Sequence, residues 1–200
     1  MARDTIAEVS DDALVVLYAN GDPDAARLLM QRLLPRVLSY AARMISDRAE
    51  AEDVAQDAML RLWKIAPDWR QGEAKISTWL YRVVTNLCTD KLRARQRRRS
   101  VALDDAPEMP DGSASALSGM ITRQRLDALQ VALDRLPDRQ RQAVVLRHIE
   151  GWANPEIALV MEIGVEAVES LTARGKRALT AALSGQRATL GYDDQEDDAP

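Results

Sequence analysis

The chain has 200 residues, 46% hydrophobic and 29% charged, with a formal net charge of −4. This composition is that of an ordinary folded chain, and the length allows one or two domains. The N-terminus is not signal-like, and no apolar run approaches the roughly 20 residues of a membrane-spanning helix. The single cysteine, Cys88, and the single histidine, His148, exclude an internal disulfide and a zinc site built within the chain. We therefore expect a protein of the reducing cytoplasm without metal or cofactor.

The first hundred residues predict helices joined by short loops. Apolar residues recur at helical spacing, β-branched residues do not alternate with polar ones, and the Asn20-Gly21 pair ends a predicted helix and not a strand. Helices are expected over 12–19, 24–44 and 49–66, followed by a loop over 67–74. Pro35 lies inside the second helix and should kink it or break its hydrogen bonding.

A further helix from Ile76 is apolar on one side and basic on the other. Residues 82–99 contain seven basic residues and one acidic residue, a local charge of +6. Such a run alone is often only a solvated helix end. Here Tyr81, Asn86 and Thr89 stand among the charges, which favours a polyanion that also exposes bases.

The composition changes after this helix. Residues 100–119 are rich in acids, Pro, Gly and Ser and lack basic residues, which predicts a flexible linker. Helical periodicity resumes from 120 to about 183, and the acidic tail over 185–200 is expected to be disordered. The predicted fold is all-α. It has two small helical domains, over 1–99 and 120–184, that we expect to move independently on their linker.

The second domain has the signals of a helix-turn-helix. Gly151 is a candidate helix C-cap, and Asn154 and Pro155 are expected to cap and begin the next helix. A turn over 163–165 then precedes a longer helix that is basic in its C-terminal half. This is the layout of a DNA-reading helix-turn-helix, although other helical hairpins also share it.

Three segments together carry a family resemblance. They are 51–63 (AEDVAQDAMLRLW), 77–87 (STWLYRVVTNL) with the following arginines, and 136–158, which contains Leu-Pro, Leu-Arg, Glu-Gly and Glu-Ile-Ala pairs or triplets. With these in order, residues 12–183 resemble the extracytoplasmic-function (ECF) class of bacterial sigma factors, the two-domain members of the sigma-70 family.

The resemblance implies three interfaces. The first segment would bind core RNA polymerase through a polar helix face. The second, with the loop before it, would bind and melt the −10 element, and the third would bind the −35 element. Trp69 in that loop either stacks on a flipped-out base or anchors the loop to the core. The implied residues are Glu52, Asp53, Gln56, Asp57 and Arg61 for core polymerase; Trp69, Arg70, Tyr81, Arg82, Asn86, Arg93, Arg95, Arg97 and Arg98 for the −10 element; and Asn154, Glu166, Glu169, Ser170, Arg174, Lys176 and Arg177 for the −35 element.

The last helix departs from the family pattern. Glu166, Glu169 and Thr172 stand where relatives often have a small, a basic and an apolar residue, and Gly175 lowers helix propensity by about 1 kcal/mol relative to alanine. Arg174 keeps the contact position of the family. Readout of the −35 element is therefore expected to be unusual or weak.

The resemblance implies a promoter-specificity subunit that acts with core RNA polymerase on promoter DNA and is held inactive by an anti-sigma factor. A sigma mimic that titrates an anti-sigma factor without binding DNA is the alternative; the basic run over 82–99 argues against it. A DNA-acting enzyme is a third possibility, but the chain has no metal-site, phosphate-loop or Ser/His/Asp motif, so no catalytic residue is expected.

Overall fold

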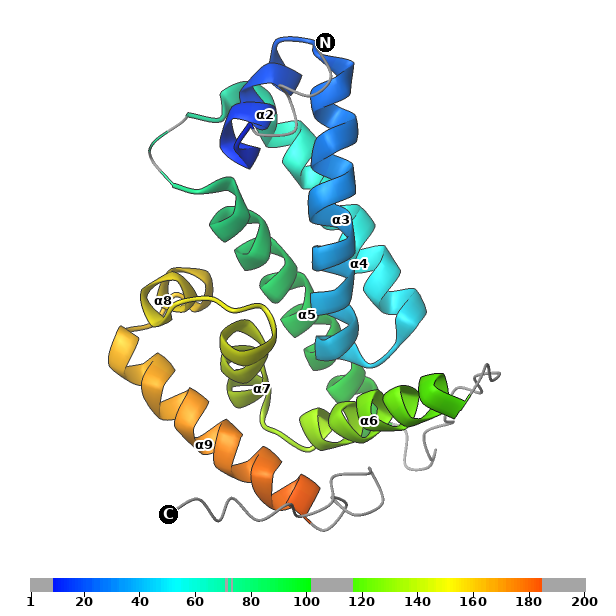
Figure 1. The fold of residues 1–200 in the computed structure, drawn as a ribbon. Helices are drawn as coiled ribbons and strands as arrows, with labels where there is room; N and C mark the ends of the chain where they lie inside the picture. Colours follow the sequence, from blue (N-terminus) through cyan, green and yellow to red (C-terminus); the bar gives the residue numbers. More distant parts are fainter. Residues whose placement is uncertain (1–8, 71, 73, 102–116, 185–200) are drawn as a thin grey trace, which may run out of the picture.

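The computed structural model describes residues 9–70, 72, 74–101 and 117–184 (Figure 1). This part of the chain is helical and contains no strand. Most of the expected linker, over 102–116, and the expected acidic tail lie outside the described residues. The two ends of the linker prediction are wrong, because the helix before it continues to Val101 and the next begins at Leu117. Within the described residues, no helix is long and apolar enough to cross a bilayer.

In the described part of the first half, residues 9–70, 72 and 74–101, there are four helices and a short 3-10 turn. Side chains of Ser10, Asp22 and Asp47 cap three of the helices by accepting hydrogen bonds from backbone N–H groups in the first turn. The elements are α2 (Asp11–Ala19), α3 (Pro23–Ile45), α4 (Arg48–Ile65), η1 (Ala66–Asp68) and α5 (Ile76–Val101).

Helix α3 continues through Pro35, so the proline does not end the helix, although it has no N–H to donate to the carbonyl of Gln31. Pro35 and Gln31, four residues earlier, are both exposed. The carbonyl that loses its helical partner therefore faces water, which can replace the missing hydrogen bond.

The core of this half lies between α3, α4 and α5. Leu33 and Val37 of α3 pack with Leu80 and Val84 of α5 in one buried cluster. Burial raises the pKa of the Cys88 thiol to about 12, so the thiolate that nucleophilic chemistry needs does not form at neutral pH. The expectation that Cys88 is a buried, small apolar residue is confirmed.

The second half contains the predicted helix-turn-helix. Gly151 has a φ of +75°, the conformation that a glycine C-cap requires. The expected N-cap is one residue off: Ala153 precedes the helix, and the Glu156 carboxylate accepts from its backbone N–H at 3.1 Å. The elements are α6 (Leu117–Asp134), α7 (Asp138–Val144), η2 (Val145–Ile149, a single π turn), α8 (Asn154–Met161) and α9 (Val165–Ser184).

Gly175 has a packing role that helix propensity does not reveal. It is buried where α9 crosses α7, and a Cβ atom there would lie 2.4 Å from Cγ2 of Val144 and 3.3 Å from the backbone oxygen of Gln140. The glycine therefore allows the two helices to approach closely.

The two halves pack against each other, with α8 against α5 and the end of α7 near α3 (Figure 1). Arg141, which is only 6% exposed, donates from Nη1 to the carbonyl oxygen of Met44 at 2.7 Å and so satisfies a carbonyl at the C-terminal end of α3. The two halves were expected to move independently, and here they contact each other. Their relative motion stays a prediction. Trp152 and Tyr81, which gave no pairing signal in the sequence, stack between the halves.

Candidate functional site

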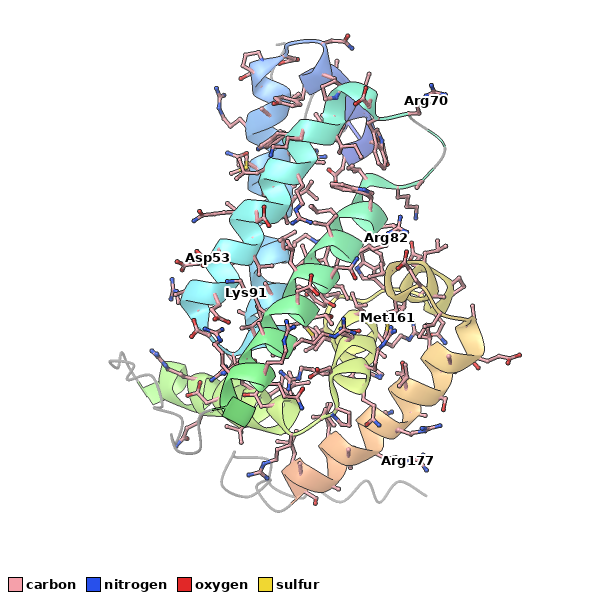
Figure 2. All side chains as sticks on the ribbon, turned by 180° about the vertical axis from the view of Figure 1, so that it is seen from behind. Asp53, Arg70, Arg82, Lys91, Met161 and Arg177 are labelled. Carbon is pink, nitrogen blue, oxygen red and sulfur yellow. The ribbon has the colours of Figure 1, made fainter. Side chains whose placement is uncertain are left out.

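The expected polymerase-docking residues form an open polar face on α4. The side chains of Asp53 and Asp57 are 70% and 47% exposed. Arg61 donates to Asp57 at 3.2 Å, one helical turn away, and Lys91 of α5 lies 3.4 Å from Asp53. Figure 2 shows Asp53 and Lys91 together on this side of the molecule. Glu52 and Gln56 are also accessible, so the structure brings all five predicted residues onto one surface.

Two expected −10 residues near the start of α5, Tyr81 and Arg82, contact residues of the second half. Tyr81 is 1% exposed and stacks on Trp152 of the other half, with ring centroids 4.7 Å apart. Its hydroxyl donates to the Glu150 carboxylate. Burial, then this hydrogen bond, raises the pKa of Tyr81 well above its ordinary value. Tyr81 is therefore not available to a base in this arrangement.

Two ion pairs flank this stacked pair. Arg82 Nη1 lies 2.9 Å from the carboxylate of Glu162, at the C-terminal end of α8. Lys75 Nζ lies 2.9 Å from that of Glu156, in the first turn of α8. The hydrogen bond between them raises the pKa of Lys75 and lowers the pKa of Glu156. Figure 2 shows Arg82 next to α8.

The basic end of α5 is more accessible than its start. Gln142 of α7 donates to Thr89, in the middle of α5, at 3.0 Å. Beyond it, Arg93, Arg97 and Arg98 are exposed and Arg95 is half-buried. Asn86 is exposed as well, so most of the predicted basic row stays accessible to solvent.

The loop before α5 holds two of the predicted residues, Trp69 and Arg70, in different surroundings. Trp69 packs against Trp79, with ring centroids 6.3 Å apart and the rings nearly edge to face. Its Nε1 is buried without a hydrogen-bond partner in the described part of the chain. This placement favours the anchoring role of Trp69 over base stacking. Arg70 is exposed and points away from the rest of the predicted site (Figure 2).

The predicted −35 residues lie on α9 and at the start of α8. Glu166, Glu169 and Arg174 are exposed, and Arg174 donates to the Ser170 hydroxyl at 2.8 Å. Asn154 donates from Nδ2 to Glu169 at 3.5 Å, which joins the start of α8 to the N-terminal part of α9. The exposed side of α9 therefore carries acceptors in its first half and donors in its second.

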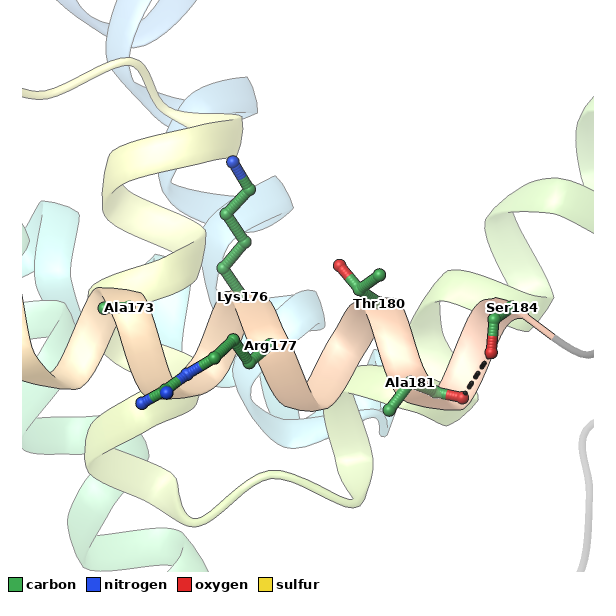
Figure 3. A pocket seen from close by; sticks show the side chains of 6 residues that line it. All are labelled: Ala173, Lys176, Arg177, Thr180, Ala181 and Ser184. Atoms are coloured by element: carbon green, nitrogen blue, oxygen red, sulfur yellow. Dashed lines mark hydrogen bonds between the residues drawn. The ribbon is translucent and has the colours of Figure 1, made fainter. Parts of the chain in front are cut away.

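The basic half of α9 borders a surface hollow of about 760 Å³. Figure 3 shows Lys176 and Arg177 leaving the helix in different directions. Because all of the lining residues come from α9, the hollow is a one-sided surface and not an enclosed small-molecule site. They are Ala173, Lys176, Arg177, Thr180, Ala181 and Ser184.

His148 of η2 lies in the positive field of this region. Burial, then the charges of Lys176 and Arg147, lowers its pKa. The imidazole is therefore neutral at pH 7. The described residues contain no group of three or more metal-ligating side chains.

Four residues at the contact between the halves were not predicted from the sequence. Lys75 and Glu162 gave no signal, Glu150 was interpreted only as part of a Glu-Gly pair, and Trp152 was not singled out. A large aromatic directly after a C-cap glycine is the one signal that was present, and it does not say what the ring packs against.

The comparisons with known proteins decide the family. The model of sigma-70 region 2 matches residues 29–98, and that of sigma-70 region 4 matches residues 126–179. The RNA polymerase sigma-H factor of Pseudomonas aeruginosa is 30% identical over 186 residues, covering 89% of this chain and 96% of the relative. The ECF sigma factor SigM of Mycobacterium tuberculosis is 33% identical, covering 88% of this chain and 86% of the relative. The chain belongs to the ECF class of sigma factors in the sigma-70 family.

Solved ECF structures share its arrangement of helices. CnrH, solved in complex with the cytosolic domain of CnrY, is 26% identical with a TM-score of 0.66, covering 88% of this sigma factor and 97% of that chain. RpoE of Bartonella quintana, solved with the anti-sigma factor NepR, is 20% identical with a TM-score of 0.63, covering 78% of this sigma factor and 94% of that chain, which shows likeness of fold alone. The relatives are transcription initiation factors rather than enzymes.

Proposed function

We propose that this sigma factor is the promoter-specificity subunit of a bacterial RNA polymerase holoenzyme. The observation that carries the proposal is the presence of both sigma-70 regions in order on one chain, with relatives matched along nearly their whole length. The polymerase performs the nucleotidyl transfer, and this chain supplies binding and no catalytic group. Its place of action is the cytoplasm, where polymerase and chromosome meet.

Core polymerase docks on the polar face of α4. Support comes from the exposure of Asp53, Gln56 and Asp57 on one side of a helix whose other side is buried. A surface of this kind suits a basic partner, since exposed charges guide association and select against partners of the same sign.

The −10 element binds along α5. Its exposed arginines attract phosphates, while Arg82 and Asn86 lie on the same helix within reach of bases once the second half has moved away. Arg70 in the preceding loop is the remaining candidate for contact with an unstacked base.

The −35 element binds at the second half, with α9 as the recognition helix in the major groove. Arg174, Lys176 and Arg177 supply positive charge, and the start of α8 at Asn154 faces the same side through its contact with Glu169. The residue range 120–184 is the domain that we assign to this task, and 1–99 the domain for core and −10 binding.

An anti-sigma factor is the expected regulator. CnrH and the Bartonella RpoE were both solved with a regulatory partner, and CnrH matches this chain over 88% of its length. A partner that holds the two halves together would keep the −10 residues of α5 covered.

Run-off transcription with purified core polymerase tests the proposal. A promoter library transcribed by core plus this sigma factor should yield discrete transcripts that core alone does not produce. The variant with Asp53→Lys and Asp57→Lys is the matched control and should give none. A chain that binds an anti-sigma factor yet never supports transcription would be a mimic, and the proposal would be wrong.

A further inference from the structure

Glu169 stands at an unusual place for an acidic side chain. It lies on the recognition helix α9, whose buried side is formed by Val168 and Gly175, and its own side chain is exposed. Helix α9 must approach a polyanion, so a carboxylate here weakens attraction to phosphate on every sequence. Such a cost is expected only where the side chain contributes something else.

One hydrogen bond places the Glu169 carboxylate beside the start of α8. Oε1 of Glu169 accepts from Nδ2 of Asn154, the first residue of α8, at 3.5 Å. The second oxygen, Oε2, has no partner among the described residues. In a helix-turn-helix, the N-terminal part of the second helix meets the base edges in the major groove, and Glu169 is the fifth residue of α9. An acceptor is therefore presented at the base-reading part of the helix.

The phosphate contacts come from other residues. Arg174, Lys176 and Arg177 follow in the next turns, and Arg174 is oriented by its hydrogen bond to Ser170 at 2.8 Å. Helix α9 thus carries a negative side chain in the part that meets the base edges and positive side chains in the part that would contact phosphates. Base recognition and attraction to the DNA backbone are therefore assigned to different residues of one helix.

We propose that Glu169 reads a cytosine in the −35 element by accepting a hydrogen bond from its N4 amino group. The inference rests on the proposed function. An ionised carboxylate only accepts, and in the major groove cytosine presents an amino donor, whereas guanine and thymine present acceptors. Adenine has a donor next to an acceptor, so it ranks second. Discrimination arises as much from repulsion at the wrong bases as from attraction at the right one.

The test is base selection by the holoenzyme. Core polymerase with this sigma factor is incubated with duplexes that carry a randomised −35 window upstream of an open −10 bubble, and bound duplexes are sequenced. The native profile should contain a cytosine column favoured by roughly 5- to 150-fold over the other bases, the range of one good base contact. The bubble removes any dependence on the −10 sequence.

Two variants and a control test whether Glu169 causes the cytosine preference. E169A should abolish the preference at this position and keep the preferences at the other positions, which show that the variant still folds and binds core polymerase. E169Q should shift the preference from cytosine toward adenine, because an amide pairs with both N6 and N7 of adenine. The control D138N removes one exposed negative charge from α7 of the same half, outside the predicted −35 residues, and should leave this column unchanged.

Two outcomes would overturn the inference. They are a native profile without a cytosine column, and a cytosine column that survives E169A. A general gain in affinity with E169A or E169Q follows from the lost negative charge, and it argues against base reading only where the cytosine column is unchanged. A native holoenzyme that selects no base at any position of the window would instead reject the proposed function itself.

Discussion

The polar faces of α4 and α5 lie on neighbouring helices of the same half, yet one is open and the other is partly covered. Asp53 on α4 has a side chain 70% exposed, whereas Tyr81 on α5 is 1% exposed. Charge accompanies this difference, beside the packing of Tyr81 on Trp152. The second half directs Glu150, Glu156 and Glu162 toward α5 and the residue before it, and these carboxylates contact polar and basic side chains there. They have no such match on the acidic face of α4.

With the site residues assigned as proposed, the contrast implies an order for assembly. Polymerase would reach α4 while the halves are together, whereas DNA would contact Tyr81 or Arg82 only after Glu150 and Glu162 have moved away. The acids of the second half occupy the side chains that phosphates or bases would otherwise contact, so separation of the halves and DNA binding are coupled.

The largest effect is expected on the open face. Asp53→Lys with Asp57→Lys should weaken binding to core polymerase by more than about tenfold, because like charges placed together at an interface cost several kcal/mol. The measurement is co-purification with core polymerase and a titrated affinity. Asp90→Lys on α5 is the control and should bind normally. Loss of helical content in the double variant would mean that these carboxylates are structural.

The accessible end of α5 should control salt dependence. Replacing Arg93, Arg97 and Arg98 with Ala should reduce the slope of log affinity for DNA against log salt by about 0.9 for each phosphate that the helix no longer neutralises. Promoter binding by the holoenzyme at several salt concentrations measures it. An unchanged slope would show that this end of the helix does not touch the DNA backbone.

In the second half, Gly175 allows α9 to pack closely against α7. Gly175→Ala should destabilise the protein by about 1–3 kcal/mol through overpacking against Val144, although alanine is the better helix former by up to about 1 kcal/mol. Denaturant unfolding measures the change. Adding Val144→Ala should recover part of the loss by making room; a more stable single variant would contradict the close approach of α7 and α9.

The ion pairs Lys75–Glu156 and Arg82–Glu162 should contribute less to the stability of the contact between the halves. Glu156→Gln with Glu162→Gln removes both carboxylates, and the amide oxygen of the first substitution can still accept from the Ala153 N–H. Each exposed pair is worth about 0–1 kcal/mol, so the population of separated halves should rise by at most about fivefold per pair. Energy transfer between dyes on α4 and α9 reports it, with Glu166→Gln as the control. A rise with the control as well would indicate a general charge effect.

The smallest effect concerns His148. Lys176→Gln removes a neighbouring positive charge that disfavours the imidazolium, so the pKa of His148 should rise, while burial still holds it below the ordinary value. An NMR titration of the imidazole measures the change. Arg177→Gln should have a smaller effect, because Lys176 and Arg147 are the charges that lower the pKa of His148. A falling pKa would reverse the assignment.

Much of the local structure could be predicted from the sequence. Helices over 12–19, 24–44 and 49–66 agree with the structure to within one residue at each end, because caps and apolar periodicity are local signals. Predictions from a single residue type were incomplete where the surroundings matter: Pro35 lies on an exposed side of a continuous helix, Gly175 lies at a close helix crossing, and the N-cap of α8 is Ala153 and not Asn154.

The sequence by itself determined the family, the helical class, the polar face of α4 and the charge pattern of α5 and α9, since each depends on residues close together along the chain. Only the tertiary structure decided that Tyr81 is buried, that Arg82 forms an ion pair with Glu162 and that Trp69 packs against Trp79. These contacts join residues up to 80 positions apart in sequence. They depend on how two amphipathic surfaces meet, and no spacing rule within either segment contains that information.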